Sequence, residues 1–339
     1  MDVEPDRVLE RDRSSERDMN SISGFHFDTT NSIACDVDKK LLDEALELCA
    51  RYEALLSRFV EGSDVWRVNH AQGKPVEVST ETMTILNCAE ELRVASGGAF
   101  NIAIGAASSL WRITKSENKG AGPMPPSEPV LNKAAAKLRE THIKLEGNKV
   151  SVTAETTLDL GGIAKGYISD RVADFLREAG ATGGLLNFGG NVVTIGRRSD
   201  GSPWRVGLQT PGVEREQSIF AFVTSSDGAV VTSGVYERAF VFEGRLYHHV
   251  LDPRDCRPAR SGLLSATVTA AEAMLADGLA TALLIMGPTD GLPLVERFGA
   301  QAVSLDGQGE LSYTSGLPIT ILDAPTTPQV AVPTIATEG

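Results

Sequence analysis

Hydrophobic residues along the chain follow two different periods, which predicts a mixture of helices and strands. Apolar positions recur every three or four residues in 39–60, the spacing of an amphipathic helix. The same spacing predicts helices at 81–96, 133–140, 164–177, 271–286 and 289–297. Alternating or short apolar runs between turn residues predict strands at 25–36, 142–147, 149–154, 185–188, 192–195, 204–211 and 261–270, and a hairpin at 300–317.

The order of these elements indicates the fold class. Several strands follow one another between 204 and 252 with no helix between them, which favours antiparallel pairing over a doubly wound parallel sheet. We therefore expect an α+β fold, with mixed, mainly antiparallel sheets packed against helices. Residues 61–69 are expected to form a turn. We expect a disordered polar segment at 1–20, one domain at 21–322, and a loose Pro/Thr-rich tail at 323–339.

Two glycines introduce the predicted helix at 164–177 and suggest a place where an anion could bind. Asp159 precedes Gly161-Gly162, and Lys165 falls in the first helical turn. Glycines before a helix let a ligand approach the main chain, whose free N–H groups favour anions. A lysine there opposes the helix dipole, so its ammonium could instead meet a phosphate. The alternative is a packing unit with a solvated lysine, in which Asp159 satisfies turn N–H groups.

Composition narrows the class of protein. The 339 residues are 42% hydrophobic and 23% charged, which is typical of a soluble globular protein. A net charge of −13 without a basic patch argues against nucleic-acid binding. Four widely spaced cysteines without a C-x-x-C pair predict neither a disulfide framework nor a zinc site. The first residues lack a signal-peptide pattern and no apolar run is long enough to span a membrane, so we expect a cytoplasmic protein without membrane insertion.

Two places carry candidate chemistry. Asp277 and Thr281 lie four apart in the predicted helix 271–286, so they share a face. A buried acid needs a partner, and Mg²⁺ would bind its carboxylate and a nearby hydroxyl; alternatively Asp277 is partly exposed and supports the helix dipole. His248 and His249 are adjacent in a predicted strand, so at most one faces a given site as a general base. A structural histidine is the alternative.

The order of several motifs resembles one family, the ApbE-like FAD:protein FMN transferases, over roughly residues 25–320. The strongest matches are DLGGIAKGYISDRVADFL with LLNFGGNV, TSGVYER, HHVLDPR, and AMLADGLATALLIMG; each alone is weak, but the four in one order are specific. The resemblance implies an architecture related to the T-fold with the site between lobes. It also implies Mg²⁺-dependent transfer of FMN from FAD to a Thr or Ser hydroxyl of a target protein as a phosphoester, releasing AMP.

Site residues follow from the same resemblance. It implies metal binding by the side chains of Asp277 and Thr281 and by main-chain oxygens near Gly162 and Ala280, with Mn²⁺ as an alternative to Mg²⁺. His249 would activate the acceptor hydroxyl, with Asp277 as the other catalytic residue. The flavin-nucleotide contacts would be Phe59, Ala99, Phe100, Asn101, Asp159, Lys165 and Leu251. The partners would be FAD and an acceptor protein with a D-x-x-[ST]-G-A-T-like motif.

The chain departs from the family pattern at a few positions near these motifs. Asn101 replaces an aspartate, Asp255-Cys256 replace Thr-Gly, Gly278 replaces alanine, and Phe27 stands where a methionine is frequent. None of these changes removes a predicted metal ligand, but they could alter flavin orientation or acceptor choice. Two other functions therefore stay open: an FAD pyrophosphatase that gives FMN and AMP, and a non-enzymatic FAD-binding protein.

Overall fold

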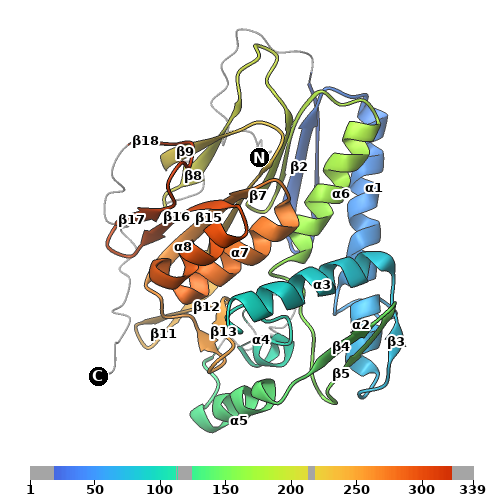
Figure 1. The fold of residues 1–339 in the computed structure, drawn as a ribbon, viewed down its shortest axis with the longest axis vertical. Coiled ribbons are helices and arrows are strands. Elements are labelled where there is room, and N and C mark those ends of the chain that lie inside the picture. The colour runs from blue at the N-terminus through green and yellow to red at the C-terminus, as the bar shows by residue number, and fades with distance from the viewer. Residues whose placement is uncertain (1–18, 112, 114–123, 213–217, 323–339) are drawn as a thin grey trace.

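The computed structural model describes residues 19–111, 113, 124–212 and 218–322. The expected disordered segment at 1–20 lies outside these residues apart from its last two, and the expected tail at 323–339 lies outside them entirely. Everything below concerns the described part of the chain, in which the predicted α+β class is confirmed (Figure 1).

One large antiparallel sheet forms the centre of the fold. Its neighbours in order are β1 (Asn20–His26), β2 (Thr29–Cys35), β6 (Gly183–Phe188), β7 (Asn191–Gly196), β10 (Ala229–Gly234), β15 (Leu263–Ala270), β16 (Gln301–Asp306) and β17 (Leu311–Tyr313). Each pairing between these strands is antiparallel, as the run of strands without helices predicted. The central strands are almost wholly buried because both faces of the sheet are covered.

Helices cover one face of this sheet and a small second sheet covers part of the other. The helices are α1 (Lys39–Leu56), α6 (Ala164–Glu178), α7 (Ala273–Met286) and α8 (Pro288–Arg297) (Figure 1). The second sheet pairs β8 (Trp204–Gln209), β9 (Ile219–Ser225) and β18 (Ile319–Ile321), and it has its own apolar cluster with the large sheet. Helix α7 is apolar nearly all round because it packs against the sheet, α6 and α3 at once.

A smaller group of elements lies below the helical layer in Figure 1. It contains the helices α2 (Asp64–His70), α3 (Thr80–Ala95), α4 (Gly105–Trp111) and α5 (Glu128–Arg139), and a sheet of β3 (Val76–Glu77), β5 (Lys149–Val152) and β4 (Ile143–Glu146). Two small hairpins reach it from the large sheet: β11 (Ala239–Phe242) with β12 (Arg245–His248), and β13 (Leu251–Asp252) with β14 (Arg257–Pro258).

The prediction of one strand at 25–36 is confirmed only in part: β2 covers Thr29–Cys35, but the chain turns just before it into the β1–β2 hairpin. Phe27 and Asp28 form the turn at φ 56° and 60°, a left-handed conformation that usually signals glycine or asparagine. The sequence contains no glycine or asparagine at these two positions that would have indicated the turn. Tertiary contacts hold it: the Phe27 N–H donates to the Glu53 carboxylate at 2.9 Å, and Asp28 pairs with Arg238 at 3.6 Å.

The expected turn at 61–69 is also wrong, because most of it is helix α2. The Ser63 hydroxyl oxygen accepts the Trp66 N–H at 2.9 Å, so Ser63 caps the first turn. The predicted helix at 39–60 stops earlier than expected, at Leu56. The helix expected at 133–140 begins five residues earlier, as α5. The other predicted helices and the hairpin of β4 with β5 occur within two residues of their expected positions.

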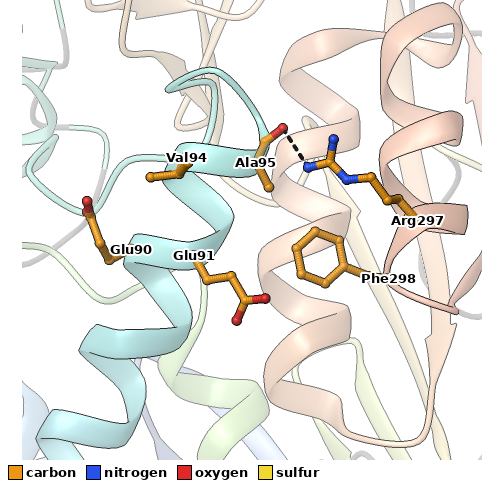
Figure 2. A pocket seen from close by; sticks show the side chains of 6 residues that line it. All are labelled: Glu90, Glu91, Val94, Ala95, Arg297 and Phe298. Atoms are coloured by element: carbon orange, nitrogen blue, oxygen red, sulfur yellow. Dashed lines mark hydrogen bonds between the residues drawn. The ribbon is translucent and has the colours of Figure 1, made fainter.

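The helical layer meets the smaller group where α3 ends beside α8. A hollow of about 490 Å³ lies at this junction, and Figure 2 shows the side chains that line it. The Arg297 guanidinium donates to the Ala95 carbonyl at 3.2 Å, and the ring of Phe298 lies next to it. Glu90 at its rim is held by Arg93 on the same helix. The hydrogen bond from Arg297 to Ala95 links the end of α8 to the end of α3 beside the hollow.

Candidate active site

A cavity of about 780 Å³ lies where the large sheet and its helices meet the smaller group of elements. The predicted site residues that line it come from five stretches of the chain: Phe59, Ala99, Phe100, Asn101, Asp159, Gly162, Lys165, His249, Leu251, Asp277 and Thr281. Ala280 is the exception, since it is fully buried in α7 behind the cavity wall. The structure therefore brings together what the sequence could only name, although the individual roles are still predictions.

The close crossing of α6 over α7 sets the geometry of one wall. A Cβ added to Gly166 would lie 2.2 Å from the Ala273 carbonyl oxygen, so only glycine fits at this crossing. The main-chain N–H of Gly166 donates to the Asp277 carboxylate at 3.0 Å. Asp170, one turn along α6, accepts the N–H groups of Ala273 and Met274 at 2.8 Å each and so caps α7. Burial raises the pKa of Asp170 to about 6.

Asp277 and Lys165 form an ion pair within this wall. The Asp277 side chain is only 3% exposed, and its carboxylate oxygens lie 3.4 and 3.5 Å from the Lys165 ammonium. The same ammonium donates to the Gly161 carbonyl at 3.0 Å. Asp277 is thus no partly exposed helix-end acid, and Lys165 is no freely solvated lysine. The ion pair supplies the partner that a buried carboxylate needs.

Thr281 and the glycine turn lie next to this ion pair. A Cβ added to Gly162 would come within 3.3 Å of the Thr281 hydroxyl oxygen and 3.4 Å of the Phe100 ring. Carboxylate, hydroxyl and carbonyl oxygens therefore converge where the helices cross. In the described part of the chain, no group of three or more His, Cys, Asp or Glu side chains could hold a metal. A metal here would depend on one carboxylate together with hydroxyl and main-chain oxygens.

Asp159 is held in place by an arginine that sequence analysis missed. Its carboxylate accepts the Gly161 N–H at 2.9 Å and lies 3.3 Å from Arg58 Nε. The Arg58 guanidinium also donates to the Ser109 hydroxyl at 2.8 Å and stacks 4.2 Å from the centre of the Phe59 ring. The Arg58 side chain is 9% exposed and Phe59 is 57% exposed. In the sequence, Arg58 is only a charged residue next to an aromatic one, and this pattern is too common to indicate a functional site.

The two adjacent histidines have different environments, as predicted, but only His248 lies in a strand, because β12 ends there and His249 follows it. His249 lines the cavity, whereas His248 is buried and lies with Nε2 3.2 Å from the Ala259 carbonyl oxygen. His249 Nδ1 lies 3.2 Å from the Arg238 carbonyl oxygen. That oxygen can only accept, so Nδ1 carries the proton and Nε2 is the basic nitrogen.

Burial keeps both imidazoles neutral. It lowers the pKa of His249 to about 3, and the nearby Arg238 charge acts in the same direction. Burial likewise lowers the pKa of His248 to about 4. At neutral pH, His249 therefore has the protonation state that a proton acceptor requires.

Two departures from the family pattern have structural consequences that can now be described. The Asn101 side chain accepts the Ala103 N–H at 2.9 Å, so the amide shapes the main chain that borders the cavity. Cys256 replaces a glycine and keeps a left-handed conformation with φ 60°. Its N–H donates to the Asp252 carbonyl at 2.8 Å, and its carbonyl accepts from the Trp111 indole at 2.8 Å. The loop thus keeps a conformation that glycine would favour.

The cavity wall also carries charged groups that were not among the predicted site residues. Among the described residues that line it, five are acidic and three are basic: Asp28, Glu53, Asp159, Glu237 and Asp277 against Arg58, Lys165 and Arg238. They come together only because the β1–β2 turn, the end of α1 and the segment after β10 meet here. The lining therefore has two more acidic than basic side chains, which disfavours an anionic ligand unless a cation accompanies it.

A cavity of about 780 Å³ between two groups of elements is typical of a protein that binds a small-molecule ligand. The model of the ApbE family matches residues 27–304. An FAD:protein FMN transferase of Klebsiella pneumoniae is 36% identical over 75% of this chain and 78% of its own length. One of Vibrio cholerae is 33% identical over 76% of this chain and 77% of its own length. The chain belongs to the ApbE family.

Solved structures agree with this assignment. The flavin transferase ApbE from Vibrio cholerae matches with a TM-score of 0.75 at 29% identity, covering 88% of this chain and 98% of that one. The ApbE protein from Thermotoga maritima matches with a TM-score of 0.79 at 29% identity, covering 88% and 97%. The resemblance inferred from the sequence motifs is thereby confirmed, and so is the expected architecture.

Proposed function

We propose that this protein transfers FMN from FAD to a threonine or serine hydroxyl of a target protein. The names of its relatives support the transfer of FMN from FAD to protein. The observation that carries the proposal for this chain is the cavity itself, which His249, Asp277 and the glycine turn at 161–162 all line. Phosphoryl transfer needs a positioned hydroxyl and neutralised phosphate charge, and these groups can provide both.

Mg²⁺, or Mn²⁺ in its place, is the cofactor that we propose. The residues fit such an ion, because carboxylate, hydroxyl and carbonyl oxygens are the donors it prefers. The side chains of Asp277 and Thr281 and the main-chain oxygens of Gly162 and Ala280 would hold it. A cation, the Lys165 ammonium, already lies between the Asp277 carboxylate and the Gly161 carbonyl, which supports a cation site there. When bound, the metal would neutralise charge on the pyrophosphate.

The residues of the chain would act on the acceptor and on FAD as follows. His249 Nε2 accepts the proton of the acceptor hydroxyl, whose oxygen then bonds to the phosphorus of the FMN half. The bond from that phosphorus to the bridging oxygen breaks, and AMP leaves with its electron pair. Arg238 supports this step by fixing the His249 tautomer through its carbonyl oxygen. The transfer consumes no oxidant or reductant.

Other cavity residues would hold the flavin nucleotide. We propose that Phe59, Ala99, Phe100 and Leu251 supply apolar contacts, since all four line the cavity. Polar contacts would come from Asn101, Asp159 and Lys165. The exposed ring of Phe59, supported by the guanidinium of Arg58, has the form of a stacking platform for an aromatic ring.

The acceptor and the location of the protein belong to the same proposal. We infer an acceptor with a D-x-x-[ST]-G-A-T-like motif. The described helices include none that is both long and apolar enough to cross a membrane. All four cysteines are free, which supports a reducing compartment such as the cytoplasm.

Release of AMP from FAD tests the proposal. Purified protein is incubated with FAD, with and without Mg²⁺, and with and without a protein carrying an acceptor threonine. We expect AMP only when metal and acceptor are both present, with flavin covalently fixed to the acceptor. AMP without acceptor would instead indicate a pyrophosphatase. Retained FAD with no AMP under any condition would indicate a binding protein.

A further inference from the structure

The ammonium of Lys165 lies where the proposed metal ion would have to bind. It is 3.4 and 3.5 Å from the two carboxylate oxygens of Asp277 and 3.0 Å from the carbonyl oxygen of Gly161. Asp277 is a predicted metal ligand, and Gly161 adjoins another one, Gly162. The Lys165 side chain is 22% exposed and lines the cavity, so Lys165 can contact a ligand there as well as Asp277.

Lysine and metal cannot share these oxygens. Mg²⁺ binds oxygen ligands at about 2.0–2.1 Å in a near-octahedral arrangement, which leaves no room for an ammonium group among them. Two cations in contact with one carboxylate would also repel each other in a poorly hydrated wall. The metal can therefore enter only when the Lys165 side chain leaves.

The pyrophosphate of FAD offers the ammonium an alternative partner. Lys165 belongs to the first turn of α6, directly after the Gly161-Gly162 turn, where main-chain N–H groups favour anions. Its flexible stem and rotatable donors suit a phosphate as well as a carboxylate. A phosphate bound at this turn would draw the ammonium from Asp277 and open the metal site.

We propose that Lys165 is a positioning residue that couples metal binding to FAD binding. Its ammonium occupies the metal site in the empty protein and moves to the pyrophosphate when FAD binds. The inference rests on the proposed function, because it takes FAD and a divalent ion as the ligands. It explains why a lysine stands in the first helical turn despite the unfavourable dipole. It also implies that FAD and metal each strengthen the binding of the other by the same factor.

Binding of Mn²⁺, followed by the electron paramagnetic resonance of the free ion, measures this coupling without turnover. The full chain is titrated with Mn²⁺ with and without FAD, no acceptor is present, and the weak binding of Mn²⁺ to free FAD is subtracted. For the wild type we expect FAD to tighten Mn²⁺ binding at least about 10-fold. In Lys165→Met, Mn²⁺ should bind the FAD-free protein at least about 10-fold more tightly than in the wild type, and the effect of FAD should shrink to below about 3-fold.

Arg58→Met is the matched control. It removes one positive charge from the same cavity wall, but Arg58 pairs with Asp159 and not with Asp277. Mn²⁺ affinity of the FAD-free protein should change less than about 3-fold in this variant. Lys165→Arg keeps the cation and should retain a dependence on FAD. Circular dichroism and thermal unfolding confirm that each variant is folded.

Two outcomes would overturn the coupling. One is unchanged or weaker Mn²⁺ binding by FAD-free Lys165→Met. The other is an equal gain in Arg58→Met, because a general loss of positive charge would then explain the effect. Both leave AMP release by the wild type untouched, so they are distinguishable from a failure of the proposed function. If the wild type bound no Mn²⁺ even with FAD, the proposed metal and the coupling would both fail.

Discussion

Gly166→Ala tests whether the crossing of α6 and α7 positions the site. By helix propensity alone, alanine in place of a helical glycine should stabilise the protein by about 1 kcal/mol. The structure predicts the opposite sign. The added Cβ would lie 2.2 Å from the Ala273 carbonyl oxygen, 2.6 Å from its carbon and 2.7 Å from the Met274 Cα. All three are main-chain atoms, so no side-chain rotation can relieve the clash.

The size of the effect follows from these distances. A carbon atom normally stays about 3.3 Å from a carbonyl oxygen, so the helices must separate by about 1 Å at the crossing. Overpacking of this kind costs about 1–3 kcal/mol, and the stiffness of the main chain places this case at the upper end. The displacement also moves Asp277 relative to Lys165, which sits beside Gly166. A misplacement of about 1 Å at a reacting site can cost about 100-fold in rate.

Urea unfolding and acceptor-dependent AMP release measure the two effects. We expect Gly166→Ala to lose about 2 kcal/mol of unfolding free energy despite its better propensity, and to lose about 100-fold in activity. Gly307→Ala is the control, since its added Cβ would meet only the Gly262 carbonyl oxygen at 3.9 Å. If Gly166→Ala were as stable as the wild type and retained activity within about 3-fold, the crossing would not constrain the site.

Three further perturbations follow from the same geometry. Gly278→Ala restores the alanine of the family pattern. Its Cβ would meet Leu92 Cδ1 at 2.3 Å, but the Leu92 side chain can rotate away. Urea unfolding should therefore show a change in unfolding free energy below about 1 kcal/mol. Asp277→Asn keeps the shape of the side chain but removes its charge. The circular dichroism spectrum should stay unchanged, while metal-dependent AMP release should fall at least about 100-fold. Normal AMP release would show that Asp277 is not a metal ligand. The folded protein depresses the pKa of His248 to about 4, below its ordinary value near 6.5, so the unfolded chain takes up the proton first as the pH falls. This contribution to the unfolding free energy is complete above about pH 6.5 and falls by up to about 3 kcal/mol towards pH 4. Between about pH 7 and about pH 4.5, His248→Gln should therefore lose less unfolding free energy than the wild type does. An equal loss in both proteins would show that His248 does not cause the pH dependence.

Much of the secondary structure and the list of site residues came from the sequence alone. The helices α3, α6 and α7 were predicted almost to their ends, because the apolar period and the terminal glycines are local signals. The antiparallel sheet followed from strands without intervening helices. The motifs were long enough to identify the family, and most of the residues that they named line one cavity.

The tertiary structure decided what those residues do to one another. The turn at Phe27 and Asp28 has no glycine, and it exists because Glu53 and Arg238 hold it. Arg58 belongs to no strong motif, and its importance depends on Asp159, far along the chain. Such contacts join segments that have no sequence pattern in common, so no local period or motif can reveal them.

The ion pair of Lys165 with Asp277 illustrates the division most clearly. The sequence determined that a lysine follows two glycines and that an acid lies in an apolar helix. Only the fold shows that their charges meet across 112 positions, because the missing side chain of Gly166 lets α6 lie directly on α7. The sequence specified the chemical groups, and close packing of two helices gave them a shared location and a common partner.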